Sequence, residues 1–185
     1  MMPNESISVL IPTYNEAENI KETLRRTIKS LDNAKENFEI LVIDDASRDK
    51  TADIAEEFLD KRGKVIKREG VRSLSLSILD GIKKASGTII VVMDADVSHP
   101  PELIPRFIEE LYKGNDLIIA SRYCKGGATA DFPLSRKAFS RLACLAGRLV
   151  TDIKDNTAGF FSIRKNALKE ANLTPRGFKI GLEIF

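Results

Sequence analysis

Short β-branched apolar runs alternate with longer amphipathic stretches along this chain, and that alternation constrains its fold more than any other feature. The most apolar of these runs is "TIIVVM", at Thr88–Met93. Strands that are apolar throughout are buried on both faces, which is typical of a parallel sheet covered by helices. The sequence therefore predicts one α/β domain with a Rossmann-like, mostly parallel sheet and helices on both faces.

Apolar residues at helical spacing lie between these runs and predict the helices. In Ala17–Ser30, for example, Ile20, Leu24 and Ile28 recur at four-residue steps along one side. We expect strands at Ile7–Ile11, Glu39–Ile43, Val65–Ile66, Thr88–Met93, Asp116–Ala120 and Gly159–Ile163. We expect helices at Ala17–Ser30, Lys50–Arg62, Ser75–Ala85, Pro101–Tyr112, Ser135–Val150 and Lys165–Ala171.

The 185 residues fit a single domain, 1–185, which is long enough to bury a core. The chain ends in "GFKIGLEIF", where no capping glycine, proline or polar tail follows the apolar run. That ending predicts that the domain is truncated at Phe185, inside a helix.

The composition limits which binding partners and which cellular compartment are expected for this protein. The formal net charge of +2 does not favour nucleic acid. Cys124 and Cys144 have neither C-x-x-C spacing nor a histidine-rich neighbourhood, so we expect two reduced thiols rather than a zinc site. The first residues lack the regions of a secretory signal, and no apolar run approaches the roughly 18 residues of a membrane-spanning helix. We therefore expect a cytoplasmic protein.

Polar clusters follow four of the predicted strands, at the point where each strand ends. They are "PTYNE" (12–16), "DDAS" (44–47), "DADVSHP" (94–100) and "SRYCKGG" (121–127). In an open parallel sheet, ligands bind beyond the carboxyl ends of the strands, which share one edge. We therefore expect the four clusters to form a single functional rim.

Asp94 and Asp96 lie one residue apart at the end of the most apolar strand. Two neighbouring carboxylates repel each other, which raises the cost of ionising both. A divalent cation reverses that cost, and hard oxygen ligands suit Mg²⁺ or Mn²⁺ rather than Zn²⁺. Because Mg²⁺ often completes its coordination with phosphate oxygens and water, this pair suits a metal-bound diphosphate. The alternatives are a pair of solvated loop acids, or a cap by Asp94 on the following turn.

Phosphate binding must rely on metal and arginine, because neither G-x-G-x-x-G nor G-x-x-x-x-G-K-[ST] occurs. Arg122 follows the fifth strand and Arg136 opens the next helix, and the planar guanidinium matches phosphate. The alternative for each is an ordinary surface arginine. His99, the only histidine, is expected to pack and hydrogen-bond within its loop rather than act as a base.

Five stretches carry a family resemblance: "SVLIPTYNEAENI", "LVIDDASRDKT", "VVMDADVSHPPEL", "ASRYCKGG" and "DNTAGFFSIRK". They resemble the motifs of family 2 glycosyltransferases of the GT-A fold. The resemblance is greatest to dolichol-phosphate (polyprenyl-phosphate) mannosyltransferases, and it extends from Ile7 to about Glu183.

The resemblance implies roles for particular residues. Asp94 and Asp96 would hold the metal and the diphosphate of a sugar nucleotide, with Asp96 the firmer metal ligand. Asp45 would lie near the base and ribose. The nucleotide pocket would also be lined by Pro12, Tyr14 and Glu16, and phosphate and acceptor would be bound by Arg122, Arg136 and the adjacent Ser135.

The sequence departs from the family pattern at two places. Ser98 stands where close relatives often carry glutamine, so a third side-chain metal ligand is not assigned. "VRSLSLSILDGI" replaces a glycine-led "GLGSA"-type stretch, which places Ser73 and Leu76 where small flexible residues are usual. The alternative is that this stretch is only the start of a helix.

The resemblance implies inverting transfer of a hexose to a polyprenyl phosphate, with peripheral contact at the cytoplasmic face of a membrane. GDP-mannose is the favoured donor and UDP-glucose the second. Because a phosphate nucleophile is already an anion, no general base is required. One alternative is transfer to a sugar hydroxyl, which needs a base from the stretch containing Asp152, Asp155 and Glu183. The other is a non-catalytic fragment that binds sugar nucleotides.

Overall fold

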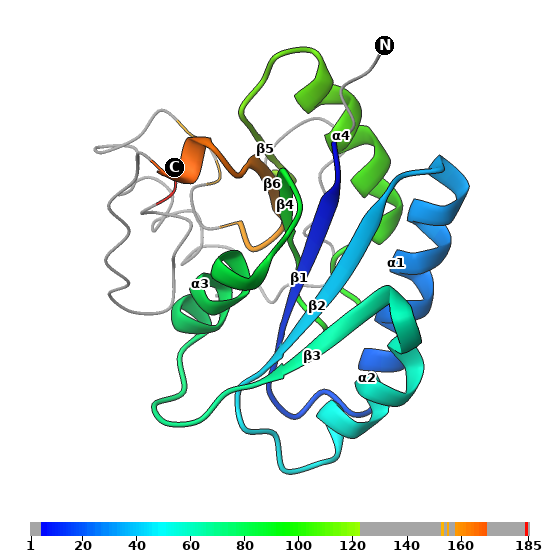
Figure 1. The fold of residues 1–185 in the computed structure, drawn as a ribbon, viewed down its shortest axis with the longest axis vertical. Helices are drawn as coiled ribbons and strands as arrows, with labels where there is room; N and C mark the ends of the chain where they lie inside the picture. The colour runs from blue at the N-terminus through cyan, green and yellow to red at the C-terminus, as the bar shows by residue number, and fades with distance from the viewer. Residues whose placement is uncertain (1–4, 123–152, 154, 156–157, 170–183, 185) are drawn as a thin grey trace.

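The computed structural model describes residues 5–122, 153, 155, 158–169 and 184 of the chain (Figure 1). Several predictions fall outside these residues and are not tested by the structure. They are the helix at 135–150, the thiols Cys124 and Cys144, the acceptor residues Ser135 and Arg136, and the ending at Phe185.

The described residues form one six-stranded sheet with the order β3-β2-β1-β4-β6-β5. Its strands are β1 (Ile7–Thr13), β2 (Phe38–Asp44), β3 (Gly63–Lys67), β4 (Ile89–Val92), β5 (Leu117–Ile119) and β6 (Phe161–Arg164). β1 pairs in parallel with β2 and β4, and β2 pairs in parallel with β3. The mostly parallel sheet is therefore confirmed. β6 runs antiparallel to both of its neighbours, a direction that the alternation of strands and helices did not predict.

The helices lie close to their predicted places, but two of them are divided. The α-helices are α1 (Ile20–Ala34), α2 (Thr51–Leu59), α3 (Leu74–Lys84) and α4 (Ile104–Tyr112), and the 3₁₀ helices are η1 (Asp60–Arg62), η2 (Pro101–Leu103) and η3 (Ala167–Lys169). The helix predicted at Lys50–Arg62 is α2 followed by η1, and the described part of the helix predicted at Lys165–Ala171 contains only η3. The helix predicted at Pro101–Tyr112 is η2 followed by α4, because Pro105 lacks an N–H and suits the first turn of a new helix.

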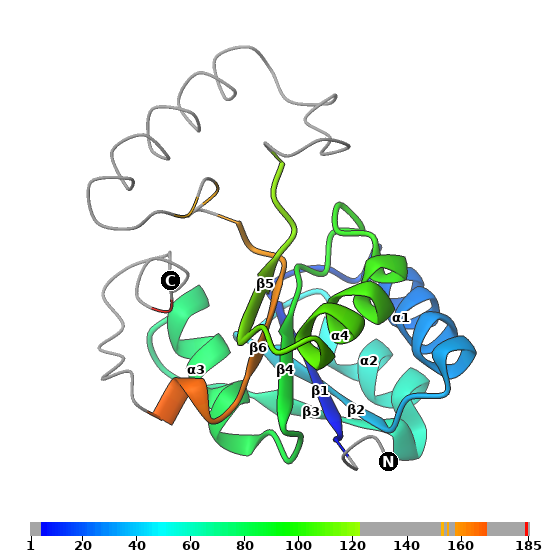
Figure 2. The same ribbon diagram turned by 90° about the horizontal axis from the view of Figure 1, so that it is seen from above.

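Both faces of the sheet are covered by helices. β1 is buried at every position. Val9 and Ile11 pack on the face covered by α1, α2 and α4, whereas Leu10 packs on the face covered by α3 and η3 (Figure 2). The faces are closed to polar ligands, so polar groups can gather only where the strands end.

The carboxyl ends of β1 to β4 lie at one edge of the sheet because these strands are parallel. In the register, Thr13 of β1 lies beside Asp44 of β2, and Leu10 of β1 lies beside Val92 of β4. The segments that follow β1, β2 and β4 therefore meet at one rim, as the sequence predicts. No helix in the described part of the chain is long and apolar enough to cross a membrane.

Candidate active site

The segment after β1 is fastened to the segment after β2 by hydrogen bonds from its backbone. The N–H of Asn15 donates to Ser47 Oγ at 2.9 Å, and the N–H of Glu16 donates to Thr51 Oγ1 at 2.8 Å. These bonds hold a fixed turn at the rim. Tyr14, at the start of that turn, remains 40% exposed.

A hollow of about 320 Å³ opens where β1 and β2 end and α3 begins. Three residues expected to bind nucleotide line it, namely Pro12, Tyr14 and Asp45. The rest of its lining is Thr13, Arg72, Ser73, Leu74 and Ser77. Glu16, the fourth expected residue, does not line the hollow. Its Oε2 accepts a hydrogen bond from Asn19 Nδ2 at 2.9 Å, within its own turn.

An arginine and an aromatic ring lie together in the lining of the hollow. Cζ of Arg72 is 4.3 Å from the centroid of the Tyr14 ring, which is a cation–π arrangement. Arg72 follows a turn at Gly70, whose φ of 96° lies in the left-handed region that favours glycine. The pair offers a flat, polarisable surface that suits a planar ring of a ligand.

A buried ion pair behind this surface was missed by the sequence analysis. Arg68, directly after β3, donates from Nη1 to Asp45 at 2.5 Å and from Nε to Asp80 at 2.8 Å. The side chains of Arg68 and Asp45 are only 8% and 12% exposed. The second oxygen of Asp45 accepts the N–H of Ser73, just before α3, at 2.7 Å. Arg68 therefore fixes both Asp45 and the start of α3.

Asp94 lies just beyond β4 and is oriented by its own loop. Nδ1 of His99 accepts the backbone N–H of Asp94 at 3.0 Å. The imidazole stacks on Phe160, with ring centroids 5.2 Å apart, so the packing role predicted for His99 is confirmed. Gly159 passes so close that a Cβ there would lie 3.2 Å from Asp94 Oδ2.

The environment of Asp94 makes its carboxylate costly to ionise. Burial raises the pKa of Asp94 above its usual value of 3.8, and repulsion from Asp96 adds to the rise, while His99 and Arg122 oppose it. The side chain still keeps 42% of its surface exposed, beside the walls formed by Gly159 and His99. A divalent cation would relieve this cost.

Asp96 is exposed and is oriented by Ser98. Its Oδ1 accepts both the backbone N–H of Ser98 at 3.0 Å and the Ser98 hydroxyl at 2.5 Å. The turn between them places Val97 at a φ of 63°, which is rare for a β-branched residue. Ser98, where the family often has glutamine, therefore orients a carboxylate in this structure.

Arg122, expected to bind phosphate, is held by a buried carboxylate. Its Nε and Nη2 donate to the two oxygens of Asp155 at 3.0 and 2.7 Å, and its backbone N–H donates to the same group at 2.9 Å. The Asp155 side chain is 0% exposed, and that of Arg122 is 26% exposed. Asp155 thus fixes the orientation of Arg122 at the rim. The phosphate-binding role of Arg122 stays a prediction.

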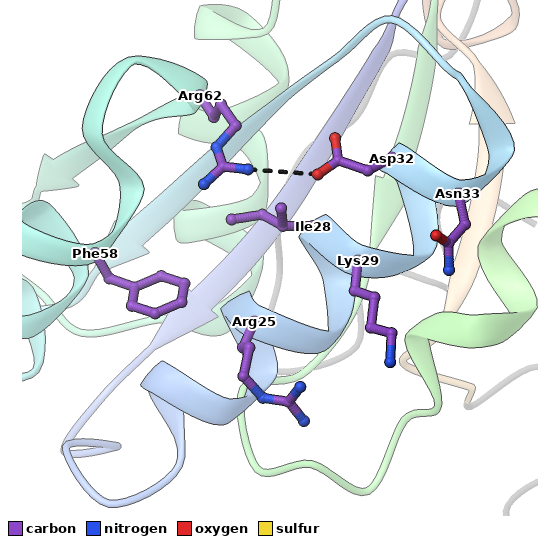
Figure 3. A pocket seen from close by; sticks show the side chains of 7 residues that line it. All are labelled: Arg25, Ile28, Lys29, Asp32, Asn33, Phe58 and Arg62. Atoms are coloured by element: carbon purple, nitrogen blue, oxygen red, sulfur yellow. Dashed lines mark hydrogen bonds and ion pairs between the residues drawn. The ribbon is translucent and has the colours of Figure 1, made fainter.

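A second hollow, of about 300 Å³, lies between α1 and α2 (Figure 3). It is lined by Arg25, Ile28, Lys29, Asp32, Asn33, Phe58 and Arg62. Arg62 forms an ion pair with Asp32 at 3.4 Å and directly precedes β3. This hollow therefore lies toward the amino ends of the strands, away from the rim, and it contains none of the predicted site residues.

Asp94 and Asp96 are the residues expected to bind a divalent cation, and they lie close enough for Asp96 to raise the pKa of Asp94. No group of three or more His, Cys, Asp or Glu side chains within the described ranges could hold a metal. Mg²⁺ is commonly bound by one or two carboxylates, with phosphate oxygens and water completing its coordination. The two carboxylates therefore suit a cation that binds together with a diphosphate.

Comparisons of sequence place the chain among glycosyltransferases. A family model described as glycosyl transferase family 2 matches residues 8–171. A dolichol-phosphate mannosyltransferase of Pyrococcus furiosus is 46% identical over 96% of this chain and 51% of that protein. A dolichol-phosphate mannosyltransferase of Saccharomyces cerevisiae is 33% identical over 96% of this chain and 68% of that protein. The chain thus spans about half the length of the Pyrococcus relative.

Solved structures show the same fold at low sequence identity. Glucosyl-3-phosphoglycerate synthase of Mycobacterium tuberculosis matches with a TM-score of 0.70 and 20% identity, over 99% of this chain and 65% of that chain. A structure of that enzyme with Mn²⁺, UDP-glucose and phosphoglyceric acid matches with a TM-score of 0.70 and 21% identity, over 97% and 63%. These likenesses confirm the expected GT-A fold.

The buried ion pair leads to a prediction about stability. Arg68→Met removes the partner of a buried carboxylate, so we expect the free energy of unfolding to fall by about 3 kcal/mol. Arg62→Met is the matched control, because it breaks an exposed ion pair and should change stability by no more than about 0.5 kcal/mol. Urea denaturation of both variants measures the difference. Equal free energies of unfolding for the two variants would show that the Arg68–Asp45 ion pair does not stabilise the fold.

The environment of Asp94 leads to a prediction about its titration. In metal-free protein, the Asp94 carboxyl carbon should titrate with a midpoint above the usual 3.8, because burial disfavours the charged form. Added Mg²⁺ should move the midpoint down, since the cation binds only the carboxylate. Carbon-detected NMR of aspartate-labelled protein, with Asp94→Asn to assign the signal, measures both values. A midpoint at or below 3.8 contradicts the proposed environment.

Proposed function

This chain belongs to glycosyl transferase family 2, and we propose that it transfers a hexose from a sugar nucleotide to a polyprenyl phosphate. The observation that supports the proposal is the order of strands at the rim: the hollow lies where β1 and β2 end, and Asp94 and Asp96 follow β4, which pairs with β1. β1 lies between β2 and β4 in the sheet, so a single ligand can span from the hollow to the two carboxylates. That is the layout a nucleoside diphosphate sugar requires.

The hollow suits the nucleoside part of the donor. Tyr14 and Arg72 offer a flat surface for the base, and Asp45 lies in the same lining. Arg68 donates to one oxygen of Asp45 and the N–H of Ser73 donates to the other, so each oxygen has one lone pair in use. An ionised carboxylate has about four acceptor sites, so acceptors remain for the ribose or base. We propose GDP-mannose as the favoured donor and UDP-glucose as the second, as the family resemblance of the sequence implies.

Asp94 and Asp96 would hold Mg²⁺ or Mn²⁺ together with the diphosphate. The Mycobacterium tuberculosis relative in fold was solved with Mn²⁺ and UDP-glucose, which supports a divalent cation here. When bound, the cation supplies charge stabilisation to the leaving nucleoside diphosphate. The protein's own contribution is to hold both residues in place, through His99 at the backbone N–H of Asp94 and through Ser98 at the carboxylate of Asp96.

The acceptor half of the proposal relies on arginine. A polyprenyl phosphate needs no base, because its oxygen is already anionic, but it needs a cation that positions it behind the anomeric carbon. Arg122, oriented by Asp155, is the candidate that the structure describes. Arg136 and Ser135 complete the proposed acceptor site from residues outside the described ranges. One in-line displacement then inverts the anomeric centre. Peripheral contact with the cytoplasmic face of a membrane would deliver the lipid.

Transfer to a neutral sugar hydroxyl is the second candidate, and it requires a general base. Of the later acids considered for that role, Asp155 is described, and its carboxylate is fully buried and paired with Arg122. Both of its oxygens already accept hydrogen bonds from Arg122, so neither is directed at a substrate hydroxyl. His99 is also unsuited, since its Nδ1 accepts the Asp94 N–H and its ring is stacked on Phe160.

The proposal predicts that donor binding depends on Asp96 through a metal ion. Asp96→Asn keeps the shape of the side chain but loses its charge, so the strengthening of GDP binding by Mn²⁺ should fall at least about tenfold. Calorimetric titration of GDP with and without Mn²⁺ measures this effect. Asp32→Asn is the matched control, because it neutralises an exposed carboxylate in the second hollow. This variant should bind GDP like the wild type. Full Mn²⁺ enhancement in Asp96→Asn would refute the metal assignment.

A further inference from the structure

The buried side of α1 carries hydroxyl groups that bond to the segment containing Asp94 and Asp96. Thr23, Thr27 and Ser30 are each at most 9% exposed. Thr23 Oγ1 donates to the carbonyl of Ala95 at 2.7 Å, and Ser30 Oγ donates to the carbonyl of Pro101 at 3.0 Å. Apolar side chains could pack equally well on the buried face of a helix. The hydrogen bonds that these hydroxyls make therefore suggest a role beyond packing.

The bond from Thr23 reaches the peptide between the two carboxylates. Ala95 is the middle residue of the Asp94–Ala95–Asp96 sequence and is 3% exposed. Its carbonyl lies beyond the end of β4, outside the ladder of the sheet. Within the described residues, Thr23 is the one donor to this carbonyl. Without Thr23 the carbonyl would be buried and unsatisfied, which a polypeptide normally avoids by shifting its backbone.

This segment has a conformation that needs support. Val97, directly after Asp96, has a φ of 63°, where a β-branched side chain is strained. Between Asp94 and His99 the other hydrogen bonds are local, from the N–H of Asp94 to His99 and from Ser98 to Asp96, while Ser30 holds Pro101 farther along the loop. Thr23 is the contact that fastens the segment between the carboxylates to a rigid element elsewhere in the fold, since α1 is packed against the sheet.

We propose that Thr23 is a positioning residue, whose hydroxyl fixes the Ala95 peptide and thereby sets the spacing of Asp94 and Asp96 for a divalent cation. The inference rests on the proposed function for the cation itself. Groups that orient metal ligands commonly change metal affinity when they are altered, although they do not touch the ion. A methyl group in place of the hydroxyl would keep the packing and lose only the bond.

Thr23→Val is therefore the test variant, because it is nearly isosteric and removes the hydroxyl. Thr23→Ser is the conservative variant, and it should keep the hydrogen bond to the carbonyl of Ala95. Thr27→Val is the matched control: Thr27 is also buried on α1, but its 2.8 Å bond is to the carbonyl of Thr23, within the helix. Its additional approach to Met93 Sδ is long, at 3.7 Å.

The first measurement is Mn²⁺ binding in the presence of GDP, with the free ion detected by electron paramagnetic resonance. The second is the melting temperature of each variant. Thr23→Val should weaken Mn²⁺ binding roughly three- to tenfold, the range expected for one lost hydrogen bond. Thr23→Ser should bind Mn²⁺ within about twofold of the wild type, and so should Thr27→Val. These readouts do not depend on glycosyl transfer.

Three results would overturn the proposal. One is unchanged Mn²⁺ affinity in Thr23→Val, which would show that the bond has no effect on the site. Another is an equal loss in Thr23→Val and Thr27→Val, which would show a general effect of α1 stability. The third is a wild-type chain that binds no Mn²⁺ with GDP, which would overturn the metal assignment of the proposed function as well. The first two leave that function intact.

Discussion

Burial of both faces of the sheet is the constraint on which the rest of this structure depends. β1 and the adjacent ends of β2 and β4 have almost no exposed side chains, so no ligand can approach across the sheet. Parallel pairing then brings the polar ends of these strands to one rim. The hollow at Tyr14 and the residues Asp94 and Asp96 lie at the same rim for this reason, although they come from distant parts of the sequence.

Several charged groups at the rim are each held by another group of the protein. Arg68 and the N–H of Ser73 hold Asp45, while the fully buried Asp155 holds Arg122. The two carboxylates after β4 are oriented by His99, Ser98 and, in our inference, Thr23. Functional side chains bind and react effectively when such supports fix them before the ligand arrives. The rim can therefore manage the charge of a diphosphate with little rearrangement, which suits a transfer that requires no general base.

The sequence was sufficient to predict the strands, most helices and the rim, because these depend on local periodicity and on the rule for parallel sheets. It also predicted three residues that line the hollow. It did not predict the bonds of Arg68 to Asp45, of Asp155 to Arg122, or of Thr23 to Ala95. These partners are far apart in the chain, and no local pattern marks them. The antiparallel direction of β6 was missed for a similar reason, since a short apolar run has no direction of its own.

The central claim is that the acceptor is a lipid phosphate. The most direct test supplies the chain with labelled GDP-mannose, Mn²⁺ and either a polyprenyl phosphate or the neutral polyprenol of equal length. The account predicts labelled lipid with the phosphate and none with the alcohol, because the described residues of the site offer Arg122 for an anionic nucleophile and no suitable base for a neutral one. Transfer to the alcohol, or to a neutral sugar hydroxyl with none to polyprenyl phosphate, would contradict it.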